Sequence, residues 1–194
     1  HPLWVEEAGI MTPEILRFML PADASAEDIY QALHEAILHN PYERVVEDLL
    51  EVAQTQPDFA QQCFWPAALQ STNQTVVDSL LIRNVLPVNG CEGAKEPPLV
   101  SAIQAGNEKL TASLMLLGAD PTQRDAAGYT AAYYAKKAGW NDIANQLIQE
   151  EEHKRAEEYA AVLARKRAAA RARHGSGQCR IRKSDGSTIP CPQL

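Results

Sequence analysis

The sequence predicts an all-α solenoid of helix pairs, with a long C-terminal helical extension and a small β-hairpin. Two observations predict the helical part. A pattern of apolar residues and glycines occurs twice at a fixed spacing between Pro97 and Ile148, and a fixed period indicates stacked repeats. Residues 149–173 contain neither glycine nor proline and are rich in alanine, glutamate, lysine and arginine, which are good helix formers. A chain of 194 residues is long enough to bury a core.

The repeat is defined by residues that recur at the same spacing. The matched pairs are Ala102 and Ala135, Gly106 and Gly139, and Leu114 and Leu147. We expect the two glycines to end a short first helix, because a left-handed residue is least costly as glycine. Apolar residues on one stripe then predict a second helix that packs on its neighbour: Leu110, Leu114 and Met115.

The loop between the two copies carries the clearest motif. Gly118-Ala119-Asp120 is followed by Asp125-Ala126-Ala127-Gly128-Tyr129-Thr130. Gly128 suits a tight turn with positive φ, and Thr130 is suited to cap the next helix. Together with the spacing, these residues resemble the ankyrin repeat, whose period is also about 33 residues. The resemblance implies a stack of helix pairs that binds a partner protein along a concave groove, formed by hairpin tips and first helices.

Weaker copies precede the two clear ones. Ala68 lies 34 residues before Ala102, and Leu80 lies 34 residues before Leu114. Earlier, Leu33-His34-Glu35-Ala36 resembles the start of the family's first helix, with His34 at the family's structural histidine, and Val45-Val46 and Leu49-Leu50 follow on a second helix. We therefore predict about four repeats over residues 25–148, two of them degenerate.

Residues 1–24 form the predicted N-terminal capping region. A helix is expected from Pro13 to Leu20, because Thr12 suits its N-cap, Pro13 its first position and Pro21 its end. Its apolar residues suit a cap on the first repeat. The alternative is a helix that docks on a partner.

Residues 149–174 form the predicted helical extension, which ends in a basic cluster. The cluster comprises Arg165, Lys166, Arg167, Arg171 and Arg173. One interpretation is a solvated helix with cations at its C-terminal dipole. The other is a binding site for nucleic acid, an anionic membrane or an acidic protein surface.

Residues 175–194 read as a hinge and a β-hairpin. Gly175-Ser176-Gly177 breaks the helix, and Ser184-Asp185-Gly186 suits a three-residue loop between two strands. This register places Ile181 opposite Ile189 and Cys179 opposite Cys191. A disulfide is compatible with that register, although an intracellular protein would keep the pair reduced.

The net charge of −7 conceals two oppositely charged segments. Residues 1–152 carry 8 lysines and arginines against 22 aspartates and glutamates, whereas residues 153–194 carry 10 against 3. Nucleic acid is therefore a candidate partner for the tail alone. The sequence offers neither a run of about 20 apolar residues nor the basic-then-apolar order of a signal peptide. We expect a cytoplasmic protein, with secretion by a bacterium into a host cell as the alternative.

The sequence lacks a pattern that predicts catalysis. His34 and His39 are five residues apart, whereas the zinc-protease motif needs four. Cys63 and Cys91 are expected to be small buried apolar side chains. We find no phosphate-binding glycine-rich loop and no nucleophile paired with a base. The prediction is a protein that is not an enzyme and has no metal, cofactor or small-molecule substrate.

The resemblance assigns the partner-binding positions residue by residue. They are Glu96, Gln104, Ala105, Ala126, Ala127, Tyr129, Lys137, Ala138 and Trp140. Tyr129 is the best single anchor, because tyrosine offers area and a polar group at low entropic cost. Packing against a neighbour is the alternative for Tyr129 and Trp140. The predicted function is binding of a partner protein in the groove, and the alternative is tethering by the basic tail.

Overall fold

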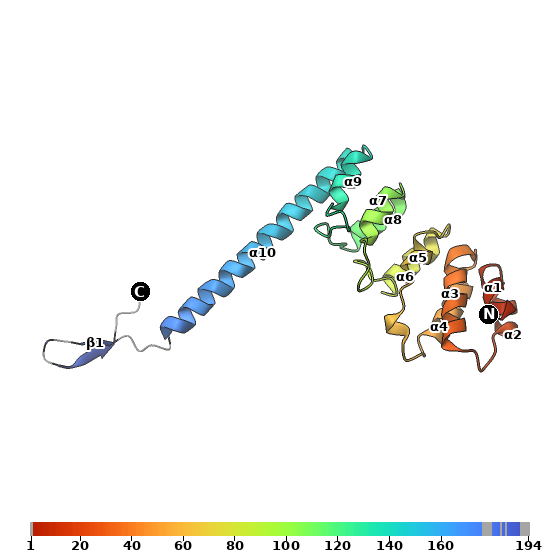
Figure 1. Ribbon diagram of the computed structural model, residues 1–194, viewed down its shortest axis with the longest axis horizontal. Coiled ribbons are helices and arrows are strands. Elements are labelled where there is room, and N and C mark those ends of the chain that lie inside the picture. The colour runs from red at the N-terminus through yellow and green to blue at the C-terminus, as the bar shows by residue number, and fades with distance from the viewer. Residues whose placement is uncertain (1, 176–179, 183, 185, 191–194) are drawn as a thin grey trace. The chain divides into compact units, whose positions relative to one another are not determined.

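The computed structural model of the protein describes residues 2–175, 180–182, 184 and 186–190. Two compact units divide the chain, His1–Leu147 and Ile148–Leu194. Helices make up most of the described residues, as predicted (Figure 1). The elements of the first unit are α1 (Leu3–Glu6), η1 (Glu7–Gly9), α2 (Pro13–Met19), α3 (Ala26–His39), α4 (Glu43–Ala53), η2 (Phe59–Gln61), α5 (Trp65–Ala68), α6 (Gln74–Ile82), α7 (Pro98–Gln104), α8 (Glu108–Leu116), α9 (Ala131–Lys137) and the start of α10 (Asn141–Gly175).

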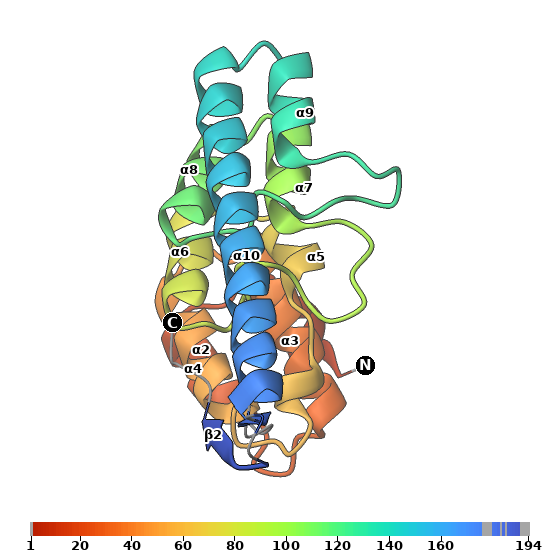
Figure 2. The same cartoon turned by 90° about the vertical axis from the view of Figure 1, so that its left-hand side faces the viewer.

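Helices of the first unit follow one another in pairs that stack. Helix α3 packs on α4 and α5, α7 packs on α8 and α9, and α6 packs on both α4 and α8. Figure 2 shows α3, α5, α7 and α9 along one side of this unit and α4, α6 and α8 along the other. One continuous apolar core runs through the pairs, from Trp4 to Leu147.

A glycine ends the first helix of each clear pair, and in the first of the two pairs an asparagine caps the second helix. Gly106 and Gly139 have φ values of 70° and 82°, the left-handed conformation expected where the first helix ends. The Asn107 side chain then accepts a hydrogen bond of 3.0 Å from the backbone N–H of Leu110 and caps α8. Asn73 caps α6 in the same way, one repeat earlier. This asparagine is a repeat position that the sequence patterns above do not include.

Hydrogen bonds also join successive pairs. The Ser71 hydroxyl donates to the carbonyl of Ile37 over 2.6 Å, and the Asn73 amide donates to the carbonyl of Pro41 over 3.3 Å. Farther along, the Ser113 hydroxyl donates to Asp78 over 2.8 Å. Each of these pairs is therefore tied to its neighbour by polar contacts as well as by the core.

Helix α3 corrects the register predicted for the first pair. Leu33-His34-Glu35-Ala36 does not begin a helix, because α3 already starts at Ala26 and its N-cap Ser25 accepts from the backbone N–H of Asp28. The motif lies in the middle of a helix of 14 residues. His34 is therefore not at a helix start, and the start predicted at this point is wrong.

The N-terminal region contains the expected helix and one that was not expected. Helix α2 begins at Pro13, and the Thr12 side chain accepts from the N–H of Ile15 as its cap. Before it, α1 buries Trp4 and Val5 against the core. In α2 only Leu16 is buried, whereas Phe18 is 90% exposed. This short helix therefore covers the core with Leu16 and the partly buried Met19, and leaves Phe18 in solvent.

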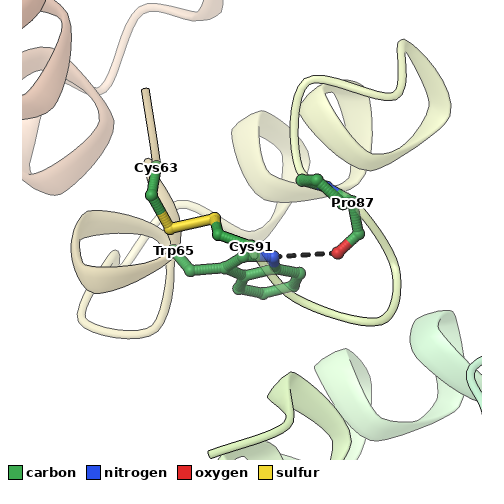
Figure 3. The surroundings of a disulfide bond; sticks show 4 residues. All are labelled: Cys63, Trp65, Pro87 and Cys91. Atoms are coloured by element: carbon green, nitrogen blue, oxygen red, sulfur yellow. Dashed lines mark hydrogen bonds between the residues drawn. A yellow bond between two sulfur atoms is a disulfide. The ribbon is translucent and has the colours of Figure 1, made fainter. Parts of the chain in front are cut away.

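A disulfide joins Cys63 to Cys91 (Figure 3). This contradicts the expectation of two buried, unpaired cysteines, and the Cys63 residue is exposed. The same two segments meet a second time, because the Trp65 indole N–H donates to the carbonyl of Pro87 over 2.9 Å. The disulfide links an irregular segment before α5 to the long irregular segment between α6 and α7, which contribute few backbone hydrogen bonds of their own.

The second unit contains the rest of α10 and a hairpin. Helix α10 continues to Gly175 without a break at Ile148, as predicted from its composition. Strands β1 (Arg180–Arg182) and β2 (Thr188–Pro190) pair antiparallel with Ile181 opposite Ile189, which confirms the predicted register. The predicted position of Cys179 opposite Cys191 lies outside the described residues.

Candidate functional site: a tyrosine cluster beside a surface depression

The loop between α8 and α9 is held by one aspartate. Asp125 Oδ1 accepts from the backbone N–H groups of Ala127 and Tyr129, each over 2.9 Å, as aspartates in tight turns do. Gly128 has a φ of 85°, as predicted for this turn. Thr130 occupies the N-cap of α9, although its side chain makes no capping hydrogen bond. This local order fixes the position of Tyr129.

Three tyrosines, Tyr129, Tyr133 and Tyr134, form what we call the tyrosine cluster. The rings of Tyr129 and Tyr133 stack with centroids 4.1 Å apart. Tyr134 meets both rings edge-on, at 6.2 Å and 5.2 Å. Offset and edge-on arrangements are those that aromatic pairs favour, so the cluster has a defined shape. Tyr129 remains 44% exposed and Tyr133 43% exposed.

A hydrogen bond ties the cluster to the loop. The Tyr134 hydroxyl donates to Asp125 Oδ2 over 2.5 Å. This bond, with the loop's N–H donors, lowers the pKa of Asp125. The same bond, aided by burial and the charges of Asp125 and Glu96, raises the pKa of Tyr134 to about 12. At neutral pH the tyrosine is therefore a donor and the aspartate an acceptor, which is the state that this bond requires.

A depression of about 370 Å³ adjoins the cluster on the side of α7 and α9. Its lining comprises Ile103, Gln104, Tyr134, Lys137 and Ala138. Gln104, Lys137 and Ala138 were predicted for the partner surface from two successive repeats, and the structure brings them together here. The depression offers apolar walls with an amide, a phenol and an ammonium group.

The other predicted partner-binding residues are placed less uniformly. Glu96, Ala105, Ala126 and Ala127 are exposed, on α7's flanks and in the loop. Trp140 is only partly buried and packs against the core. Packing, the alternative considered for Trp140, therefore accounts for this side chain, and it does not line the depression.

Sequence reasoning missed Tyr133, Tyr134 and Asp125 as parts of this site. Tyr133 follows Tyr129 by four residues, the spacing that places side chains on the same face of a helix, and Tyr134 is its neighbour. That spacing was the available signal. The carboxylate of Asp125 carried no signal beyond its place in a turn.

The basic cluster of the tail lies in the second unit. Arg165, Lys166, Arg167 and Arg171 are exposed along α10, and within the described residues no ion pair involves them. Arg173 belongs to α10, but its side chain lies outside the described part. Earlier in the same helix Arg155 pairs with Glu151 at 3.5 Å.

The described part of the chain contains neither a candidate metal site nor a candidate membrane-spanning helix. No group of three or more histidine, cysteine, aspartate or glutamate side chains there is arranged to hold a metal ion. None of the described helices has the length and apolar composition to cross a membrane.

Comparison with protein-family models and with curated proteins found no match for this chain. Its function is therefore inferred from its own residues.

Proposed function

We propose that this chain is an ankyrin-type repeat protein that binds a partner protein through the tyrosine cluster and the adjoining depression. Three features support the repeat assignment: the spacing of the repeated residues, the helix pairs that stack on one another, and the positive-φ glycines at matched positions, Gly106 and Gly139. A binding role, rather than catalysis, fits a site whose exposed residues are aromatic, small or amide-bearing, with one ammonium group, that of Lys137.

The observation that carries the proposal is the exposure of two stacked tyrosines that a third holds in place. Tyrosine is enriched among residues that dominate binding energy, because it buries a large area with little loss of side-chain freedom. The hydrogen bond from Tyr134 to Asp125 and the stacking of Tyr129 on Tyr133 hold the rings before a partner arrives. Such preorganisation reduces the cost of binding.

The test is a pull-down from nuclease-treated lysate with the full oxidised chain. Tyr129→Ala is expected to weaken capture of the specific partner by about tenfold or more, the effect of a residue that dominates an interface. Tyr42→Ala is the matched control, because Tyr42 is 46% exposed against 44% for Tyr129 and lies before α4. Equal capture by wild type and Tyr129→Ala would contradict the proposal.

The basic tail remains a second candidate, supported by four exposed cations on α10 that form no ion pair with the other described residues. A full-chain variant with glutamine at Arg165, Lys166, Arg167 and Arg171 separates the two. If tethering to phosphates is the function, binding is lost in this variant and falls steeply with salt in the wild type. If the tyrosine cluster is the function, this variant captures the same protein as the wild type.

We further propose that the protein works in an oxidising compartment. Disulfides persist in secreted and periplasmic proteins and are rare in the cytosol, and Cys63 is paired with Cys91 although it is exposed. This observation favours an extracellular or periplasmic location over the cytoplasmic one first expected. Alkylation of thiols in freshly lysed source cells tests it: the proposal requires that neither cysteine be labelled before reduction.

A further inference from the structure

A second cavity, distant from the tyrosine cluster in sequence, lies between α3 and the segment that follows α4. It has a volume of about 390 Å³. We call it the α3 cavity, and the lining residues used below are Glu27, Tyr30, Gln31, His34, Asp58 and Phe64. Nothing in the proposed function uses it.

The charge of the α3 cavity is one-sided. Glu27 and Asp58 contribute two carboxylates, and the described lining includes no lysine or arginine. Within the described residues Glu27 takes part in no ion pair. A cationic ligand would therefore supply the missing counter-charge, whereas an anion would be repelled.

In the described part of the chain, one of the two carboxylate oxygens of Asp58 accepts a side-chain hydrogen bond and the other does not. The Tyr30 hydroxyl donates to Asp58 Oδ1 over 2.6 Å. Burial, and then this bond, raise the pKa of Tyr30 to about 12, so the hydroxyl remains a donor at neutral pH. Asp58 Oδ2 accepts no side-chain hydrogen bond from the described part of the chain, and Asp58 belongs to the lining of the cavity.

Aromatic and acceptor groups complete the lining. The aromatic residues of the lining are Tyr30 and Phe64. The ring of Phe59 lies 6.4 Å from that of Tyr30 and 6.0 Å from that of Phe64, but Phe59 does not line the cavity. The buried Nδ1 of His34 lacks a hydrogen-bond partner among the residues that the structure describes. The lining therefore combines two carboxylates and a histidine with two aromatic side chains.

We propose that the α3 cavity binds a guanidinium group. A guanidinium carries five N–H donors in one plane, pairs with carboxylates and stacks on aromatic rings. It is also less strongly hydrated than an ammonium ion, and so it loses less on entering a partly enclosed cavity. The group belongs to an arginine side chain, either of a free small molecule or of a peptide.

The test uses N-acetyl-arginine methylamide as probe and N-acetyl-lysine methylamide as its matched comparison. The oxidised full chain is titrated at about 0.15 M salt, where charges farther apart than about 8 Å are largely screened, and the His34 ring resonances are followed by NMR. The arginine probe is expected to shift these resonances with a dissociation constant of about 1 mM, a strength suited to so small a group. The lysine probe is expected to bind at least fivefold more weakly.

Three variants locate the site. Glu27→Gln is expected to weaken binding by about fivefold, as for an exposed charge pair, and Asp58→Asn by about tenfold or more, as for a charge-assisted hydrogen bond. Glu51→Gln removes the same charge from an exposed position on α4 outside the cavity, and it should leave binding unchanged. Circular dichroism checks that each variant is folded.

Other results would overturn the proposal. Unshifted His34 resonances would exclude this cavity as the site, and equal or tighter binding of the lysine probe would exclude guanidinium recognition. A loss with Glu51→Gln as large as that with Glu27→Gln would mean that only the net charge matters. Titration with an arginine-containing peptide then separates the two sources of the guanidinium group. If the natural ligand is a peptide, this peptide should bind more tightly than the arginine probe. If the natural ligand is a free small molecule, it should not.

Discussion

Removing the disulfide between Cys63 and Cys91 gives the sharpest prediction of stability. The two cysteines have a sequence separation of 28. In the chain-entropy description, a bond that closes a loop of this length stabilises the folded state by about 3.6 kcal/mol at 25 °C. Cys63 is exposed and Cys91 only half-buried, so replacing both by alanine removes little packing. The free energy of unfolding should therefore fall by nearly the loop-closure contribution alone.

Urea denaturation of the full chain measures this loss. With an m-value of about 2 kcal/mol/M, the unfolding midpoint should fall by ~1.8 M on reduction or in the Cys63→Ala/Cys91→Ala variant. Reducing agent should have no effect on that variant. Trp65→Phe removes the hydrogen bond to Pro87 between the same two segments, which is about 1 kcal/mol, and it distinguishes the covalent link from the contact around it. Coincident unfolding curves for oxidised and reduced protein would refute the entropic reasoning.

The remaining predictions concern one cap and one hydrogen bond. Asn107→Ala removes the bond to the N–H of Leu110 and should destabilise the protein by about 1 kcal/mol, lowering its melting temperature by ~2–4 °C; Asn107→Asp should keep most of this, as calorimetry can show. Because the folded pKa of Asp125 is lowered, its contribution is present above the ordinary value of 3.8 and is lost as the pH falls through the lowered pKa. Tyr134→Phe should raise the pKa of Asp125 toward 3.8, measured by NMR titration, and an unchanged pKa would show that the hydroxyl is not its main partner. The contribution of Tyr134 to stability depends on pH in the opposite direction. It is fully present below pH 10.0 and is lost as the pH rises toward about 12, because the folded pKa of Tyr134 is raised.

The sequence predicts those parts of the fold that are fixed locally. The turn after each first helix requires positive φ, which makes Gly106 and Gly139 visible at a fixed spacing. The continuation of α10 follows from a stretch without helix breakers, and the register Ile181 opposite Ile189 follows from the turn between the strands. In each case the deciding interactions lie within a few residues.

The parts that were missed depend on contacts between distant segments. The pairing of Cys63 with Cys91 is decided by where two irregular segments meet, and the spacing of the cysteines carries no sign of it. The start of α3 was misplaced because a short motif at Leu33 was given more weight than the cap at Ser25. The α3 cavity likewise needs Asp58, which reaches α3 only through the fold.

Helix α9 leaves part of the tyrosine cluster outside the core, where it is available for the binding that we propose. Its buried residues are all alanines, Ala131, Ala132 and Ala135, each no more than 5% exposed. The helix leaves Tyr133 43% exposed, although an aromatic side chain would bury more apolar area than alanine in the core. Helix α9 packs on α7, and Tyr134 packs against the core and lines the depression. The rings of Tyr129 and Tyr133 contact Tyr134 and keep exposed area that the proposed partner would cover.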